Sequence, residues 1–171
     1  MNKNTIIIAI NFLVFIALQV FAFKNFVLFD VGFSFVYVIC LLLLPIEFGF
    51  LTVMFLGFGT GLIVDIYYNT LGIHASACVA LAFIRPFWAK IITPRSGNYE
   101  ANVIPTVHAY GAPWFISYAF PLLIIHHAVF FLIEAGGTQF LGSTLLKILV
   151  SSTLSLVFII SIQYLFFNKK K

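Results

Sequence analysis

A chain of 171 residues that is 63% hydrophobic and only 8% charged is too apolar for a soluble domain, in which about a quarter of the residues are charged. Its mean hydropathy of +1.13 indicates that its solvent is a lipid bilayer. The net charge of +4 comes from scattered basic residues that mostly flank apolar runs, which argues against nucleic-acid binding and favours contact with lipid headgroups. We expect one polytopic membrane domain covering residues 1–171.

The apolar runs predict about six transmembrane helices, because each spanning helix needs about 20 apolar residues. The first run is longer than the apolar part of a secretory signal and other runs follow it, so we interpret it as a retained helix. The run 33–64 is too long for one helix and is interrupted at Glu47, between Pro45 and Gly49, which predicts two short helices joined by a tight turn. The expected spans are 5–23, 33–46, 48–65, 71–88, 113–133 and 141–167.

The main polar segment is the loop 89–112, between the fourth and fifth expected spans. Because the other connections are short and the number of crossings is even, both termini should lie on one side of the membrane. Placing them in the cytoplasm satisfies the positive-inside rule. Basic residues then lie inside at Lys3, Arg85, Lys90, Arg95 and 169–171, and outside at Lys24 and Lys147.

Gly57, Gly61 and Asp65 are spaced four residues apart, so they form one stripe on the expected third helix. Small residues at this spacing let two helices approach closely in lipid, either within this chain or between two proteins. A carboxylate near hydrocarbon costs about 2.5–3.5 kcal/mol and needs compensation. For Asp65 the alternatives are hydrogen bonds from backbone at the start of the fourth helix, a cation or substrate contact, and a contact with a partner protein.

The later spans carry four further polar or amphipathic candidates. Arg85 and Trp88, at the end of the fourth span, are interpreted as interfacial anchors. His126 and His127 lie inside the fifth span, and adjacent histidines point about 100° apart on a helix, so they do not form a metal-binding pair. We expect neutral histidines that are hydrogen-bonded between helices.

Other chemistry-bearing residues fit structural roles. Cys40 and Cys78 fall in apolar runs and are expected to be small packing residues. No metalloprotease, serine-hydrolase, phosphate-loop or dinucleotide pattern is present in the sequence. The serines of the sixth span have no base nearby in sequence. We therefore expect a protein that is not an enzyme and has no catalytic residue, metal site or cofactor.

The segment 57–72 reads GF-x2-G-x3-D-x5-LG and resembles the MreD family of rod shape-determining membrane proteins. The resemblance extends to chain length, to about six spans and to a cytoplasmic segment after the fourth. The stretch containing Arg85 and the two histidines looks like a Bacteroidetes version of the family. One departure is Asp30, which lies where many members carry a basic residue and a proline. The motif residues are Gly57, Phe58, Gly61, Asp65, Leu71 and Gly72.

This resemblance implies a fold similar to the substrate-binding S components of energy-coupling-factor vitamin transporters. It also implies a location in the bacterial inner membrane and a role in the cell-elongation machinery. The implied partners are MreC, the actin homologue MreB, and the RodA glycosyltransferase with its class B penicillin-binding protein. Members of the family are not known as enzymes.

Two functions follow as hypotheses. The first is a non-enzymatic scaffold that holds partner helices in lipid and so supports cell shape and peptidoglycan synthesis. The alternative is a vitamin-binding subunit of a transporter, for which His126 and His127 are candidate polar groups at mid-membrane. S components dock through alanines four apart on the first helix, whereas here Ala9 and Ala17 are eight apart with Leu13 between them, which weakens the alternative.

Overall fold

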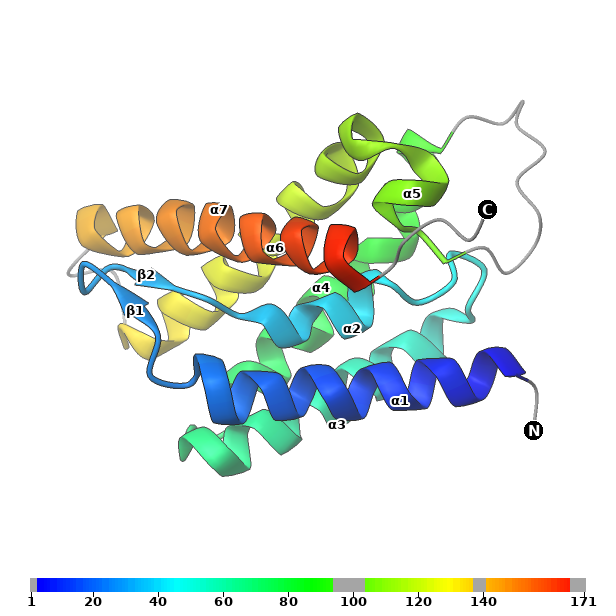
Figure 1. Cartoon of the computed structure of the whole chain (residues 1–171). Coiled ribbons are helices and arrows are strands. Elements are labelled where there is room, and N and C mark those ends of the chain that lie inside the picture. The colour runs from blue at the N-terminus through cyan, green and yellow to red at the C-terminus, as the bar shows by residue number, and fades with distance from the viewer. Residues whose placement is uncertain (1–2, 94–103, 137–140, 167–171) are drawn as a thin grey trace.

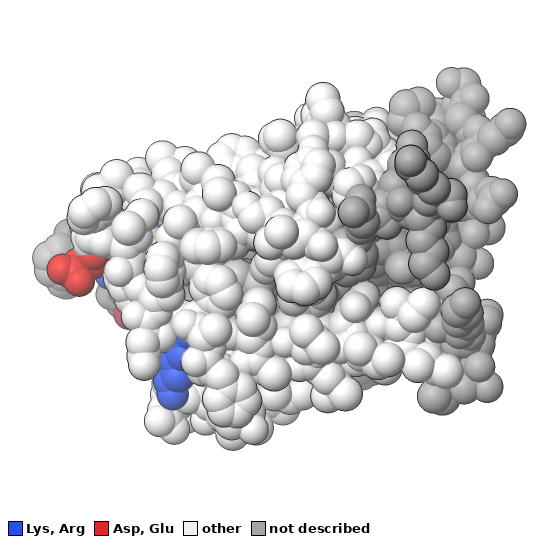
Figure 2. Space-filling view, in the orientation of Figure 1, with Lys and Arg blue, Asp and Glu red and all other residues white. Residues whose placement is uncertain are grey.

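The computed structural model describes residues 3–93, 104–136 and 141–166 (Figure 1). Within these ranges, five helices are long and apolar enough to cross a membrane, so the chain is an α-helical, multi-pass membrane protein. Figure 2 shows a face that is almost free of charged side chains, as expected for contact with lipid. The five helices are α1 with its π-helical extension η1 (Lys3–Leu18 and Gln19–Phe23), α3 (Phe50–Tyr68), α4 (Ile73–Ile92), α6 (Ala112–Glu134) and α7 (Leu141–Phe166).

The expectation that residues 33–46 form a spanning helix is wrong. A short strand, β2 (Gly32–Phe33), pairs antiparallel with β1 (Val27–Leu28), and the chain then continues as a 3-10 turn, η2 (Val36–Val38), and a single α-helical turn, α2 (Ile39–Leu42). Residues 32–44 are called the unwound segment below. In Figure 1 this segment runs alongside α1 and α7, from the β1–β2 hairpin to α2.

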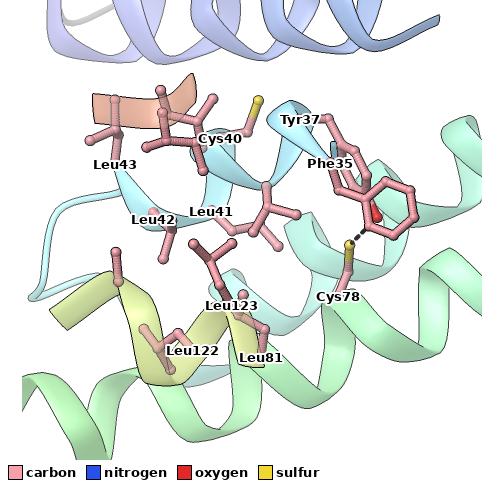
Figure 3. Close-up of a cluster of buried hydrophobic side chains, with 14 of the residues drawn as sticks. Phe35, Tyr37, Cys40, Leu41, Leu42, Leu43, Cys78, Leu81, Leu122 and Leu123 are labelled. Carbon is pink, nitrogen blue, oxygen red and sulfur yellow. Dashed lines mark hydrogen bonds between the residues drawn. The ribbon is translucent and has the colours of Figure 1, made fainter. Parts of the chain in front are cut away.

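The apolar side chains of the unwound segment are enclosed by the protein on all sides. Every side chain from Phe35 to Leu44 is at most 4% exposed. Figure 3 shows Leu41 and Leu42 next to Leu81 of α4 and Leu123 of α6. A continuous apolar run of this kind does not distinguish a buried helix from buried extended chain, which explains the wrong expectation.

The hairpin of α3 and α4 forms as expected, with small shifts at its ends. The third helix is expected at 48–65 and extends to Tyr68, and the fourth is expected at 71–88 and extends to Ile92, with Pro86 inside it. The turn between them uses positive φ angles at Asn69 (56°) and Gly72 (83°). Asn69 ends α3 in a left-handed conformation and Gly72 precedes α4 in one, so the chain reverses within a few residues.

The remaining helices match their expected spans closely. Helix α6 exceeds the span 113–133 by one residue at each end, and the start of α7 coincides with that of the span 141–167. The loop 89–112 is partly helical, since α4 ends at Ile92 and a short helix, α5 (Val107–Tyr110), precedes α6. Its residues 94–103, which include Arg95, lie outside the described residues, as do the lysines at 169–171. The start of α1 and the end of α7 lie at the same end of the bundle (Figure 1).

Candidate functional site

Two serines of α7 bind the backbone of the unwound segment. Ser151 and Ser155 are four residues apart, so their hydroxyls lie on one face of α7. The backbone N–H of Phe33 donates to Oγ of Ser151 (2.9 Å), and that of Phe35 donates to Oγ of Ser155 (2.9 Å). Irregular backbone inside a bilayer must be hydrogen-bonded by the protein, and these hydroxyls provide the acceptors.

Gln19 of η1 binds the same segment from the opposite side. Its Nε2 donates to the backbone oxygen of Ser34 (3.0 Å) and to the hydroxyl of Tyr68 (2.8 Å). Its Oε1 accepts from the backbone N–H of Tyr37 (3.3 Å). Gln19 is fully buried. Its single amide group therefore hydrogen-bonds to the backbone on both sides of the point where β2 is followed by the 3-10 turn.

Tyr37 connects the unwound segment to two histidines. Its hydroxyl oxygen lies 2.9 Å from Nδ1 of His74 on α4 and 2.8 Å from Nε2 of His126 on α6. Cys78, one turn after His74, has its sulfur 3.7 Å from the same oxygen, the contact drawn as a dashed line in Figure 3. All four side chains are fully buried. We call Tyr37, His74 and His126 the tyrosine–histidine cluster.

His127 makes a separate set of contacts, and its tautomer follows from them. Its Nδ1 lies 2.7 Å from the carbonyl oxygen of Leu123, which only accepts, so Nδ1 carries the proton. Its Nε2 is therefore an acceptor for the Ser155 hydroxyl at 3.2 Å. The imidazole also stacks on the ring of Phe35, with centroids 5.1 Å apart and planes 21° apart. His126 and His127 thus hydrogen-bond to different elements, as their 100° separation on a helix requires.

Arg85 is not an interfacial anchor, because its side chain is fully buried. Its Nε donates to the hydroxyl of Tyr118 (2.6 Å), and its Nη2 donates to the carbonyl oxygen of Leu44. The Tyr118 hydroxyl in turn donates to the carbonyl oxygen of Leu42 (3.0 Å). Arg85 and Tyr118 therefore provide hydrogen-bond donors for backbone carbonyls at and just beyond the carboxyl end of α2.

Trp88, the second residue expected at the interface, is half-buried. Its indole N–H donates to the carbonyl oxygen of Ser117 on α6 (3.1 Å). The contact joins α4 to α6 one turn beyond Arg85.

Asp65 binds the first turn of α4. Its Oδ1 accepts from the hydroxyl of Thr70 (2.6 Å) and the backbone N–H of His74 (3.0 Å), and its Oδ2 accepts from the backbone N–H of Ala75 (2.9 Å). Gly72, at the N-cap of α4, has no side chain to do this. This arrangement is the first of the three alternatives for Asp65, and it places the carboxylate at the favourable end of the α4 dipole.

The two motif glycines pack α3 against α4. A Cβ on Gly61 would lie 2.4 Å from Cα of Ala75, and one on Gly57 would lie 3.1 Å from the carbonyl oxygen of Cys78. Phe58 and Leu71, by contrast, are 50% and 103% exposed. The motif therefore divides into an internal seam, which adjoins the tyrosine–histidine cluster through His74, and two apolar side chains at the surface.

Sequence reasoning missed several residues of this polar core. Gln19 was a detectable signal, since it is one of two amide side chains, with Asn11, in an apolar span, and it is the fully buried one. The serines of α7 are visible in the sequence, but in the sequence analysis they are considered only as catalytic nucleophiles and not as hydrogen-bond acceptors for backbone. Tyr37 and His74 carried no signal, because nothing in their spacing indicates that they meet. Among the described residues, no group of three or more His, Cys, Asp or Glu side chains could hold a metal ion.

An apolar groove of about 560 Å³ lies between α1 and α3. Both helices contribute one face, and Leu13 and Phe55 on its rim are 72% and 75% exposed. Gly59 also lines the groove, and no heavy atom lies within 4 Å of the position that its Cβ would take. The lining residues are Ile8, Ala9, Phe12, Leu13, Ile16, Phe48, Phe55, Leu56, Gly59, Thr60 and Ile63.

Comparisons of the chain with protein-family models, curated proteins and solved structures found no match. The likeness to the MreD family is therefore one of sequence motif and helix layout alone.

Proposed function

We propose that this protein is a non-enzymatic membrane scaffold of the bacterial cell-elongation complex, located in the inner membrane, that supports cell shape and peptidoglycan synthesis by binding partners. In this proposal it is an MreD-like protein, and its partners are MreC, MreB, and RodA with its class B penicillin-binding protein. The unwound segment makes a sixth crossing beside the five apolar helices, and both termini are cytoplasmic.

The observation that carries the proposal is the groove between α1 and α3. On α1 its lining extends from Ile8 to Ile16, which corresponds to about 12 Å of helix, or two turns. A single transmembrane helix of a partner matches a groove of this kind, because both of its walls are helices that span the membrane.

The chemistry of the groove defines the partner's face. The one hydroxyl among its lining side chains, that of Thr60, donates to the carbonyl oxygen of Leu56 in its own helix (2.6 Å). The partner's face should therefore be apolar. Ala9 and Gly59 leave room for large side chains of the partner, which suits association by packing in lipid.

Substitution of Gly59 tests this surface. Gly59→Leu fills the groove without an internal clash, so the protein should fold while losing its partner. We expect at least a tenfold loss of co-purified partner in detergent, which corresponds to about 1.4 kcal/mol. Gly142→Leu is the matched control, because Gly142 is also a helical glycine with open space around its Cβ position, but on α7.

Equal loss of the partner in both glycine variants, or in neither, would contradict the assignment of the groove. In the host, depletion of the protein should turn rods into spheres. Normal cell shape with impaired uptake of one nutrient would overturn the scaffold role.

The alternative is an S-component-like subunit that binds a small molecule such as a vitamin. One observation favours it: transporters build their solute sites from interrupted helices, and here an interrupted segment meets buried polar side chains from three of the spanning helices. The measurement is native mass spectrometry of the purified protein. A bound vitamin at one copy per chain would support this alternative, and an unliganded mass would favour the scaffold.

A further inference from the structure

The hydroxyl of Tyr37 is shared by two imidazoles, and this limits how protons are arranged in the cluster. Nδ1 of His74 and Nε2 of His126 both lie within 3 Å of the same oxygen. A hydroxyl donates only one hydrogen bond, so when Tyr37 donates to one imidazole, the other imidazole must donate to Tyr37. With both imidazoles neutral, the three side chains carry the protons needed for one continuous chain of two hydrogen bonds.

When both imidazoles are neutral, the ring nitrogens that face away from Tyr37 form no hydrogen bond. Nε2 of His74 and Nδ1 of His126 are buried and have no hydrogen-bond partner. Whichever way the two hydrogen bonds through Tyr37 are directed, one of these nitrogens carries an unshared lone pair and the other carries an N–H without an acceptor. A proton that enters the cluster therefore adds to a ring nitrogen that no other group occupies.

We propose that the tyrosine–histidine cluster is a proton-operated latch that holds the unwound segment in the bundle and releases it when the histidines are protonated. Each protonation forms one N–H bond, with the proton taken from the aqueous buffer. When both imidazoles are charged, both inner nitrogens donate to Tyr37, and its own proton has only the sulfur of Cys78, at 3.7 Å. Two cations on either side of one oxygen also repel each other strongly in a low-dielectric interior.

The surroundings of the cluster do not neutralise two added charges. Helix α3 contributes Asp65, whose carboxylate already binds the backbone N–H of His74, and Tyr68, whose ring is 5.0 Å from that of His74. Helix α4 contributes Cys78, helix α6 contributes His127, and α7 contributes the hydroxyl of Ser155 through His127. From η1 the neutral amide of Gln19 donates to the Tyr68 hydroxyl, and just after η1 the ammonium of Lys24 lies 5.5 Å from the centroid of the Tyr68 ring. Asp65 is thus the one carboxylate among these described contacts.

The latch acts on an element whose other polar contacts described above engage its backbone. Tyr37 joins the segment to α4 and α6 through a side chain of its own, whereas Gln19, Ser151, Ser155, Arg85 and Tyr118 bind backbone groups of the segment. Releasing the hydroxyl lets both imidazoles reach water and bind protons. Acid favours the state that binds more protons, so the released state gains as pH falls. This inference is independent of the groove and of the scaffold function.

Hydrogen exchange of peptides covering residues 33–44 tests the latch in the full-length protein in nanodiscs. Between about pH 7.5 and about pH 5, the range in which histidines change charge, exchange corrected for intrinsic rates should accelerate. Release linked to two protons increases the released fraction by up to about a hundredfold per pH unit. His74→Gln and His126→Gln should each reduce this to at most about tenfold per pH unit, because glutamine hydrogen-bonds without titrating and one histidine remains. His108→Gln, outside the cluster, is the control and should retain the full acceleration.

Tyr37→Phe separates the latch from a purely structural role. Loss of the hydroxyl should give fast exchange already at neutral pH, with little further change in acid, whereas a structural role alone would leave the pH dependence intact. In the Cys40→Ala protein, labelling of Cys78 with a maleimide, divided by the rate for denatured protein at the same pH, provides a second readout. Exchange and labelling that do not respond to acid would overturn the proposal, as would an acid response that disappears only in His127→Gln.

Discussion

Asp65 and Arg85 are charged residues of this protein that lie in its interior, and each binds the backbone of a different element. The carboxylate of Asp65 accepts from the first turn of α4, and the guanidinium of Arg85 donates to the carboxyl end of the unwound segment. Asp65 faces the helix end whose partial charge is opposite to its own. Charged side chains inside a bilayer are often functional. A helix end accounts for Asp65, whereas Nη1 of Arg85 is buried without a hydrogen-bond partner among the described residues.

Asp65→Asn should destabilise the protein although it keeps the shape of the side chain. The N–H₂ group of the new amide would face a backbone N–H that now donates to the carboxylate. Two donors would then face each other, which leaves a buried donor unsatisfied at a cost of about 1–3 kcal/mol. The measurement is the thermal midpoint in detergent. Asp30→Asn is the control, because Asp30 is exposed and its positive φ of 59° suits asparagine. Equal midpoints for the two variants would contradict the capping role, and unchanged partner recruitment by Asp65→Asn would exclude an essential charge.

The unwound segment is the element whose conformation depends most on distant parts of the chain. Its apolar side chains would also suit a helix, as the expected span 33–46 assumed. The irregular conformation of the segment is stabilised by side chains that replace the missing helical hydrogen bonds, among them Gln19 before it and Ser151 and Ser155 far after it. These partners lie in other spans, so local sequence reasoning could not find them.

Ser155→Ala should loosen this element without removing any apolar contact. The substitution leaves the N–H of Phe35 without its acceptor and Nε2 of His127 without its donor, at a cost of about 1–3 kcal/mol. We expect a lower thermal midpoint and faster hydrogen exchange in peptides containing Phe35. Ser161→Ala, on the same helix, is the control, because the Ser161 hydroxyl donates only within α7, to Val157 (2.8 Å). If the two variants behave alike, the serine does not hold the segment.

For the whole molecule, hydrophobicity and length were sufficient to locate the five long helices to within a few residues. The Gly57–Asp65 stripe also indicated which face of α3 packs closely, because small residues at helical spacing have few other uses in lipid. The polar core could not be predicted in the same way. Tyr37, His74 and His126 meet only because the fold brings three elements together, and the sequence carries no record of that contact.

The direction of the unwound segment is a property of the whole molecule that labelling can measure. If it crosses the membrane, the turn at Asp30 and the turn at Glu47 lie on opposite sides; both residues are exposed. In a Cys40→Ala/Cys78→Ala background, the proposed inner-membrane location with cytoplasmic termini predicts that Asp30→Cys reacts with an impermeant maleimide from the periplasm and Glu47→Cys only after the membrane is opened. Reaction of both from one side would mean an odd number of crossings and would contradict the six-crossing topology.

The separation in sequence between the unwound segment and α7 has a consequence for biogenesis. The amides of Phe33 and Phe35 find their acceptors 118 and 120 residues later. Since a chain is synthesised from its N-terminus, these amides emerge long before their acceptors exist, and bare amides are not tolerated in hydrocarbon. The segment must therefore wait, either as a transient helix or shielded by the insertion apparatus, until the last helix has been made. A nascent chain truncated before α7 should be recognised as incomplete and degraded.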